Sequence, residues 1–240
     1  ATRAVLKERS RVPTPQADVP IASYKENFRG LLTFIKVDSA TGHMKIGFQI
    51  LMPGFNYDLS RSGKGPSREW SFFTSYNSEG ANTLLEVNAS QNDKDFIAAV
   101  NRKVAGQCVA TGKAKQWTTP YAHNLMGEDG NARSEMIKTE TVLEAKDCPG
   151  LVYYLPTPKS PHGVDVDPSG EFMAAGGKLA TVIPVHSFAK MQAAIAAKAF
   201  DREIDGIPVL KYEAVNACEV KEPGLGPLHT EFDDKGNAYT

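Results

Sequence analysis

The chain has 240 residues, of which 41% are hydrophobic and 9% aromatic, so its composition excludes a disordered protein. Lys and Arg number 27 against 28 Asp and Glu, which gives a formal net charge of −1 at pH 7. Such a small charge provides no strong field for attracting nucleic acid or anionic lipid, and no apolar run approaches the roughly 18 residues of a membrane span. The 20 Gly and 15 Pro indicate many turns, and the length suits a single all-β unit.

The first predicted element is a β-hairpin over residues 32–50, in which two strands of alternating polarity flank the turn Asp38–Gly42. A long loop rich in Gly, Pro, Ser and charged residues follows over 51–70. A helix is predicted next over 93–105, because apolar residues recur there at helical spacing. They are Phe96, Ile97, Val100 and Val104.

A second long loop is predicted over 110–160, and loops of this length in a compact domain often carry binding sites. The hairpin pattern returns at 164–176. A second helix is predicted over 187–200, with Ser187 as the N-cap residue in front of an apolar face. The last element is a third hairpin at 230–239.

The three hairpins share one plan, in which a short turn begins with Asp and ends with Gly. Three copies predict a repeating antiparallel architecture, for which a β-propeller is the leading candidate and a β-sandwich the alternative. The final strand at 237–240 has no later segment to pair with, and the basic N-terminus lacks the apolar stretch of a signal peptide. We therefore expect the chain to be an internal piece of a longer protein.

The three cysteines, Cys108, Cys148 and Cys218, are 40 and 70 residues apart. No spacing typical of a metal-binding cysteine pair occurs, and three is an odd number. The sequence therefore predicts isolated thiols that do not indicate the redox compartment.

Two of the five histidines occupy similar positions in two copies of the hairpin. His162 lies five residues before the turn residue Asp167, and His229 lies four residues before Asp233. In a propeller, equivalent positions of neighbouring blades converge on the central axis, where imidazoles could surround Cu, Zn, Fe or Ni. The alternative is that both are core or capping histidines. The remaining histidines, His43, His123 and His186, are predicted to be structural or surface residues.

Long motifs surround His162 and His229. One is Pro-His-Gly-Val-Asp-Val-Asp-Pro-Ser-Gly, beginning at Pro161, and the other is Gly-Leu-Gly-Pro-Leu-His-Thr, beginning at Gly224. With the Gly-Gly-Lys-Leu-Ala-Thr-Val-Ile-Pro-Val-His run at 176–186, they resemble the nitrous-oxide reductase family in its second, non-proteobacterial-type lineage. The resemblance covers most of the chain, from about Ser23 onward.

This resemblance implies a seven-bladed N-terminal β-propeller with short inserted helices and long loops. Its axis would hold a sulfide-bridged tetranuclear copper centre bound by seven histidines, of which His162 and His229 match two. Residues 1–240 would then be an incomplete propeller domain of several blades. The family's C-terminal cupredoxin domain, with its dinuclear copper centre, would lie outside this chain.

The resemblance also implies a structural calcium site. Tyr76 and Glu79 match a Tyr-Asn-Ser-Glu segment whose Tyr and Glu bind calcium in the family, and oxygen donors of this kind suit that hard cation. A later aspartate completes the set and matches Asp95, with Asp93 as the competing choice. Ser160 stands where the family often has an Asn ligand, so its place in the site is open.

The function implied is the two-electron reduction of nitrous oxide to dinitrogen and water in denitrification, a reaction of nitrogen metabolism. The resemblance also implies that the full-length protein is a periplasmic homodimer that receives electrons from cytochrome c or a similar donor. No catalytic residue beyond the metal ligands is expected in this chain, and the isolated piece is predicted to be inactive. One alternative is a non-catalytic β-propeller module that binds a protein partner. Another is a mononuclear zinc hydrolase that uses Asp165 or Glu231 near the two histidines.

Overall fold

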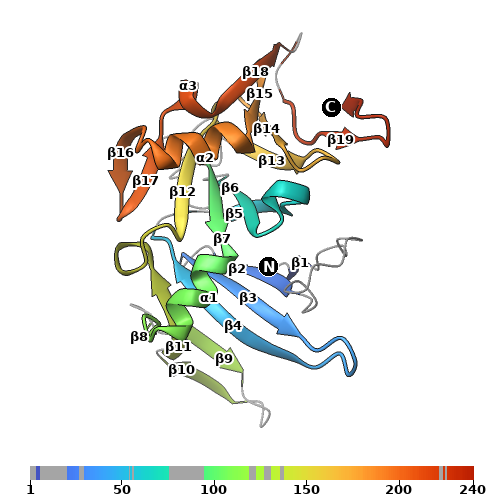
Figure 1. Ribbon diagram of the computed structural model, residues 1–240. Coiled ribbons are helices and arrows are strands. Elements are labelled where there is room, and N and C mark those ends of the chain that lie inside the picture. The colour runs from blue at the N-terminus through green and yellow to red at the C-terminus, as the bar shows by residue number, and fades with distance from the viewer. Residues whose placement is uncertain are drawn as a thin grey trace.

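The computed structural model describes residues 4–5, 21–26, 30–53, 55, 57–75, 95–118, 123–126, 131–135, 138–221, 224 and 226–240. This part of the chain consists mainly of strands, arranged in three larger sheets and two separate hairpins (Figure 1). None of its helices is long and apolar enough to cross a membrane. The predicted all-β class is confirmed.

The first sheet contains six strands in the order β1-β2-β3-β4-β11-β8. Their bounds are Ala4–Val5 (β1), Ile21–Glu26 (β2), Leu31–Val37 (β3), Met44–Leu51 (β4), Lys138–Glu144 (β11) and Lys115–Thr118 (β8). β3 and β4 form the predicted hairpin, and the Asp38 carboxylate closes its turn by accepting hydrogen bonds from Ala40 N and Thr41 N, each at 2.9 Å. β11 joins β4 in parallel, and β9 (His123–Met126) pairs with β10 (Ala132–Glu135) as a separate hairpin.

The second sheet also has six strands, in the order β16-β17-β12-β7-β6-β5. Their bounds are Phe200–Ile204 (β16), Ile207–Leu210 (β17), Val152–Pro156 (β12), Phe96–Asn101 (β7), Trp70–Ser75 (β6) and Tyr57–Ser62 (β5). The pairs β5–β6, β6–β7 and β7–β12 are antiparallel, whereas β17 joins β12 in parallel. A short 3₁₀ helix, η1 (Gly65–Ser67), lies between β5 and β6.

The third sheet has four antiparallel strands in the order β13-β14-β15-β18. Their bounds are Pro161–Val166 (β13), Phe172–Gly177 (β14), Val182–Ser187 (β15) and Asn216–Lys221 (β18). The helices α2 (Phe188–Ala196) and α3 (Tyr212–Val215) precede β18 in the chain. The chain ends in the hairpin of β19 (Glu231–Phe232) and β20 (Ala238–Tyr239), so both later hairpin predictions are confirmed.

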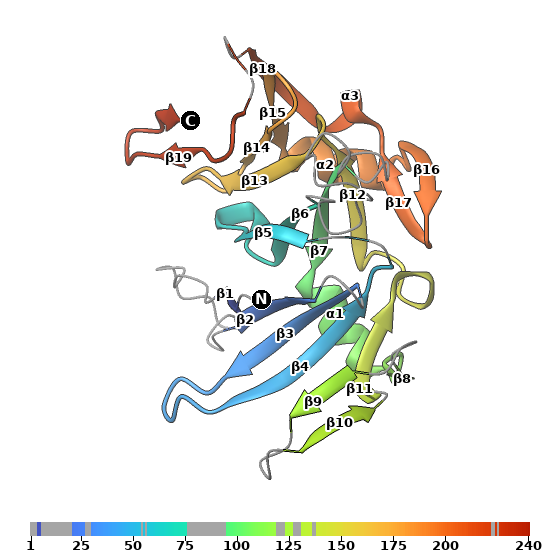
Figure 2. The same cartoon turned by 180° about the vertical axis from the view of Figure 1, so that it is seen from behind.

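Two sets of four adjacent antiparallel strands, β5-β6-β7-β12 and β13-β14-β15-β18, lie in the second and third sheets. In each set the last strand comes after an excursion into other sheets, β8 to β11 in the first and β16 to β17 in the second. A four-stranded antiparallel sheet is the unit from which β-propellers are built. The first strands of the two sets, β5 and β13, lie side by side (Figures 1 and 2). The arrangement suits a β-propeller, while the number of seven blades stays a prediction.

The helix predicted over 93–105 is wrong for residues 96–101, which form the strand β7. Alternate residues of β7 enter two different hydrophobic clusters, with Ala98 and Val100 in one and Ile97 and Ala99 in the other. A strand that is buried on both faces is continuously apolar, and such a run can imitate helical spacing. The helix α1 (Arg102–Ala110) begins only after Asn101, whose side chain accepts hydrogen bonds from Lys103 N and Val104 N at 3.1 and 3.2 Å.

The predicted loops and the second helix also differ from the structure. The stretch 110–160 carries the strands β8 to β12 together with the 3₁₀ helix η4 (Ala145–Asp147), and 51–70 carries β5 and η1. Polar strands such as β8 lack the apolar alternation that makes a strand visible in sequence. The N-cap prediction for α2 is confirmed, since the Ser187 side chain accepts a hydrogen bond from Lys190 N. α2 ends at Ala196 rather than at 200, because Phe200 begins β16.

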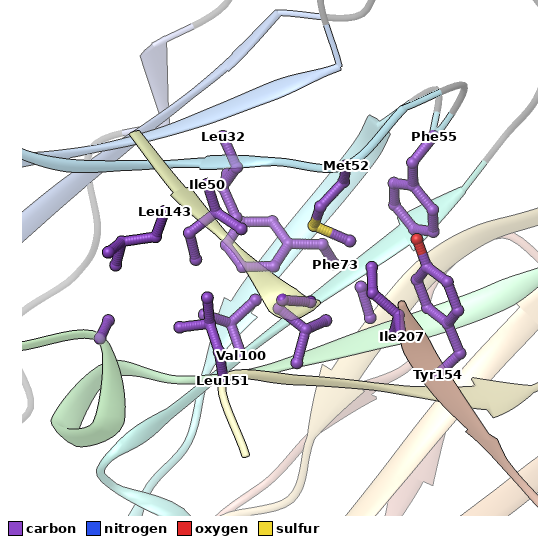
Figure 3. Close-up of a cluster of buried hydrophobic side chains, with 14 of the residues drawn as sticks. Leu32, Ile50, Met52, Phe55, Phe73, Val100, Leu143, Leu151, Tyr154 and Ile207 are labelled. Atoms are coloured by element: carbon purple, nitrogen blue, oxygen red, sulfur yellow. The ribbon is translucent and has the colours of Figure 1, made fainter. Parts of the chain in front are cut away.

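The two hydrophobic clusters lie on either side of β7. The first joins the first and second sheets and includes Leu32, Ile50, Phe73 and Tyr154, as Figure 3 shows. The second joins the second and third sheets and includes Trp70, Phe72, Val164, Met173, Phe188 and Met191. Since side chains of β7 enter both clusters, this strand links the two parts of the hydrophobic core.

The prediction of three isolated thiols is wrong for two of them. Cys108, near the end of α1, forms a disulfide with Cys148, which follows η4. Their Cα atoms are 6.2 Å apart, within the usual range for a disulfide. Cys218 is free and exposed. The pairing depends on how α1 packs beside β11, which a separation of 40 residues does not reveal.

Candidate metal centre

His162 and His229 face each other at the junction of β13 with the segment before β19. Their ring centroids are 5.1 Å apart, and their planes cross at 76°. The structure thus brings together the two residues selected from the sequence, although 67 positions separate them (229 − 162). Among the described residues, no group of three or more His, Cys, Asp and Glu is placed to hold a metal ion. Copper binding by this pair therefore stays a prediction.

A β-bulge at the start of β13 positions His162. Pro161 pairs with Gly177 and Val164 with Ala175, so β13 contains one residue more than β14 over this stretch. Such a bulge changes the regular alternation of side chains and can redirect one of them. The His162 carbonyl also accepts a hydrogen bond from Thr74 Oγ1 at 2.6 Å, which ties the bulge to β6 of the second sheet.

The segment that carries His229 lies directly against two glycines. A Cβ atom on Gly163 would lie 2.2 Å from the Leu228 carbonyl oxygen and 3.1 Å from Nδ1 of His229. A Cβ atom on Gly176 would lie 2.5 Å from the Pro227 carbonyl oxygen. These glycines allow the two backbones to approach closely, and Gly163 explains why the Pro-His-Gly motif needs its glycine. Sequence reasoning did not assign either glycine a role, although Gly163 adjoins a predicted ligand.

An ion pair between a buried carboxylate and a half-exposed guanidinium lies beside His229. Asp165 on β13 is 3% exposed, and its Oδ1 accepts a hydrogen bond from Arg61 Nε at 2.7 Å. Its Oδ2 accepts one from Thr230 N at 2.8 Å and lies 3.4 Å from Nδ1 of His229. Arg61 Nη2 also donates to Glu231 Oε1 at 3.1 Å. The group therefore connects β5, β13 and β19.

Asp165, which the zinc-hydrolase alternative named as a possible base, is paired with Arg61 and accepts a hydrogen bond from Thr230 N. Arg61 was missed by sequence reasoning. It lies 104 residues before Asp165, and no local pattern marks it.

The other three histidines belong to other elements. His43 is exposed in the turn between β3 and β4, and His123 begins the strand β9 instead of lying in a loop as predicted. His186 on β15 is fully buried, and this burial lowers its pKa to about 4. Its neutral ring donates from Nε2 to the Pro156 carbonyl oxygen at 3.0 Å. Nε2 of His186 is therefore bonded within the core, while its buried Nδ1 has no hydrogen-bond partner among the described residues. The prediction of a structural residue is confirmed.

Of the predicted calcium ligands, Tyr76, Glu79 and the competing Asp93 lie outside the described residues. Asp95 and Ser160 are described and meet, because Ser160 N donates to Asp95 Oδ1 at 2.8 Å. Ser160 is fully buried and adopts a positive φ of 60°. Calcium binding by these residues stays a prediction.

The fold and the site together define an all-β chain in which β13 and the segment before β19 bring two imidazoles together, edge to face. The chain is similar to nitrous-oxide reductases: it is 30% identical to that of Pseudomonas fluorescens over 199 residues and 30% identical to that of Stutzerimonas stutzeri over 212 residues. These matches cover 82% and 85% of this chain, which spans only 26% and 27% of the length of the two relatives. The resemblance expected from the histidine motifs is confirmed.

Other comparisons add little to this relationship. No family model matches the chain. Among solved structures, it is similar to a proposed 6-phosphogluconolactonase of Bacteroides fragilis, with a TM-score of 0.44 and 9% identity over 94% of this chain and 40% of the other. Hydrazine synthase of Kuenenia stuttgartiensis gives a TM-score of 0.37 and 12% identity, over 93% and 64% of the two chains. Likenesses at such low TM-scores do not define a shared fold.

Proposed function

We propose that the chain is a segment of the N-terminal β-propeller of a copper-dependent nitrous-oxide reductase. In this proposal, His162 and His229 are two ligands of a tetranuclear copper-sulfide centre. The observation that carries it is the 5.1 Å approach of the two rings, because both lie in the motifs that resemble the family. The other ligands and the cupredoxin domain would lie outside these 240 residues, since the chain spans about a quarter of its relatives' length.

The donor chemistry of the pair fits copper. Neutral imidazole nitrogens are suitable ligands for copper, and the two rings come from separate segments that the bulge, the glycines and Asp165 hold in place. Two imidazoles alone are too few for a complete centre. The fit is therefore that of one part of a ligand set.

When bound, such a centre supplies the two electrons that the reduction of nitrous oxide to dinitrogen and water requires. In this proposal, the other residues of the chain hold the two histidines in place and orient their rings. His162 is fixed through its carbonyl by Thr74, and His229 is fixed through its backbone against Gly163. The Arg61–Asp165 pair keeps a buried carboxylate beside the imidazoles without leaving its charge uncompensated.

We further propose that the protein is a periplasmic homodimer that receives electrons from cytochrome c or a similar donor and binds calcium. The disulfide between Cys108 and Cys148 supports such a location, because disulfides persist mainly in oxidising compartments such as the periplasm.

The test is histidine substitution in the protein that carries the complete ligand set. We expect His162→Ala and His229→Ala each to lose most of the copper of the centre and the reduction of nitrous oxide. His43→Ala is the matched control, because this exposed turn histidine should leave both properties unchanged. Copper content is measured by metal analysis and activity by nitrous-oxide consumption. Wild-type copper content in both site variants would overturn the proposal and favour the protein-binding module.

A further inference from the structure

We infer that Asp165 is a positioning residue for His229: it faces Nδ1 of the imidazole and thereby leaves Nε2 as the nitrogen for a metal. The inference deepens the proposed function, on which it rests for the identity of the metal. Its geometric part stands on the contacts around Asp165 alone.

The first argument is that the Asp165 carboxylate is fixed. Its side chain is 4% exposed, and each of its oxygens accepts a hydrogen bond, Oδ1 from Arg61 Nε at 2.7 Å and Oδ2 from Thr230 N at 2.8 Å. Arg61 also contacts Glu231, so its guanidinium is held from two sides. A carboxylate with both oxygens engaged in a buried site has little freedom to rotate. It can therefore impose an orientation on a neighbouring ring.

The second argument is the approach of the imidazole to that carboxylate. Nδ1 of His229 is 3.4 Å from Asp165 Oδ2, slightly beyond the usual hydrogen-bond distance, and a small rotation of the ring would close the gap. Within the described residues, this buried nitrogen has no hydrogen-bond partner. A carboxylate oxygen can accept a further hydrogen bond beside the one from Thr230 N. In a neutral imidazole one nitrogen donates while the other accepts, so a proton on Nδ1 leaves the lone pair on Nε2.

The third argument is that the same carboxylate also fixes the backbone of His229. Thr230 is the next residue, and its N–H bond to Asp165 sets the direction of the chain at the histidine. The carbonyl of the preceding residue, Leu228, lies close against Gly163. Metal-binding histidines commonly donate their second N–H to a carboxylate, which fixes both tautomer and ring orientation. The contacts of Asp165 match that arrangement.

Glu231 provides a matched control. It is the second carboxylate partner of Arg61, but its side chain is 76% exposed. Its hydrogen bond is with Arg61 and not with the imidazole of His229. A general change in the electrostatics around Arg61 should follow from Glu231→Gln as well as from Asp165→Asn. An effect on the His229 ring should follow only from substitution of Asp165.

The experiment is nitrogen NMR of the full chain labelled at histidine, recorded at about pH 8, well above the ordinary imidazole pKa. We expect wild-type His229 to carry its proton on Nδ1, Asp165→Ala to shift the tautomer population toward Nε2–H, and Glu231→Gln to match the wild type. A wild-type ring protonated on Nε2, or equal changes in both variants, would overturn the inference. If Asp165→Ala does not fold, the wild-type tautomer decides alone.

Titration with cuprous ion separates this inference from the proposed function. Perturbation of the Nε2 signal of His229 supports both, and we expect Asp165→Ala to weaken this binding about 10-fold or more. Perturbation of Nδ1 overturns the positioning role. If, in the protein that carries the complete ligand set, cuprous ion perturbs neither nitrogen while the Nδ1–H tautomer is present, the positioning role is supported and the copper function is contradicted.

Discussion

Protonation of His186 is expected to destabilise the chain in mildly acidic solution. The ring is fully buried on β15 and donates to the Pro156 carbonyl, and burial lowers its pKa from 6.5 to about 4. As the pH falls, the unfolded chain therefore binds a proton before the folded chain does. The stability that depends on neutral His186 is fully present above about pH 6.5 and is lost progressively as the pH falls toward 4.

The size of the effect follows from the difference between the two pKa values. A shift from 6.5 to about 4, at about 1.4 kcal/mol per unit, corresponds to a loss of about 3 kcal/mol in the free energy of unfolding. A typical domain has about 5–15 kcal/mol in total, so this one ring would remove a large part of the stability.

Urea unfolding followed by circular dichroism at several pH values between about 7 and 4 measures this loss. His186→Gln removes the titrating group but keeps an N–H donor for the Pro156 carbonyl. Over this pH range its free energy of unfolding should therefore fall by about 3 kcal/mol less than that of the wild type. His43→Gln, at an exposed turn position, should retain the wild-type dependence. If wild type and His186→Gln lose equal stability on acidification, the reasoning is refuted.

Three further predictions concern the site and its supports. Gly163→Ala should cost about 1–3 kcal/mol by overpacking, because its Cβ would lie 2.2 Å from a carbonyl oxygen. In the control Gly106→Ala the new Cβ would meet no atom within 4 Å, so no stability should be lost. Equal urea midpoints for the two variants would contradict the overpacking argument. Cys108→Ser should lower the stability by about 4 kcal/mol, given the 40-residue separation that the disulfide closes, whereas Cys218→Ser should have little effect. Glu79→Gln should reduce the calcium-dependent gain in melting temperature and leave the copper content unchanged. An equal calcium shift in variant and wild type would refute that assignment.

The hairpins could be predicted because their signals are local. Asp38, Asp167 and Asp233 each accept backbone hydrogen bonds within their own turns, so a few adjacent residues determine each connection. Ser187 could be predicted as an N-cap for the same reason. The strand β7 could not, because burial on both faces removes the alternation that distinguishes a strand from a helix.

The site was predictable only where motifs mark it. His162 and His229 lie in long recognisable motifs, but no comparable signal marks the contacts that position them. Arg61 reaches Asp165 across 104 positions, and the requirement for Gly163 comes from a backbone that passes over it 65 positions later in the chain (228 − 163). Such contacts arise from the packing of sheets, and no local or periodic sequence pattern indicates them. The disulfide was missed for the same reason.

The parallel pairing of β4 with β11 has a consequence for biosynthesis. Leu51 pairs with Glu144, so a ribosome must add 93 residues (144 − 51) after completing β4 before the partner strand exists. At about 5–20 residues per second, this takes about 5–19 s. During that interval β4 presents an unpaired edge, which can recruit strands of other nascent chains. A chaperone that covers this edge until β11 emerges would therefore raise the yield of folded protein.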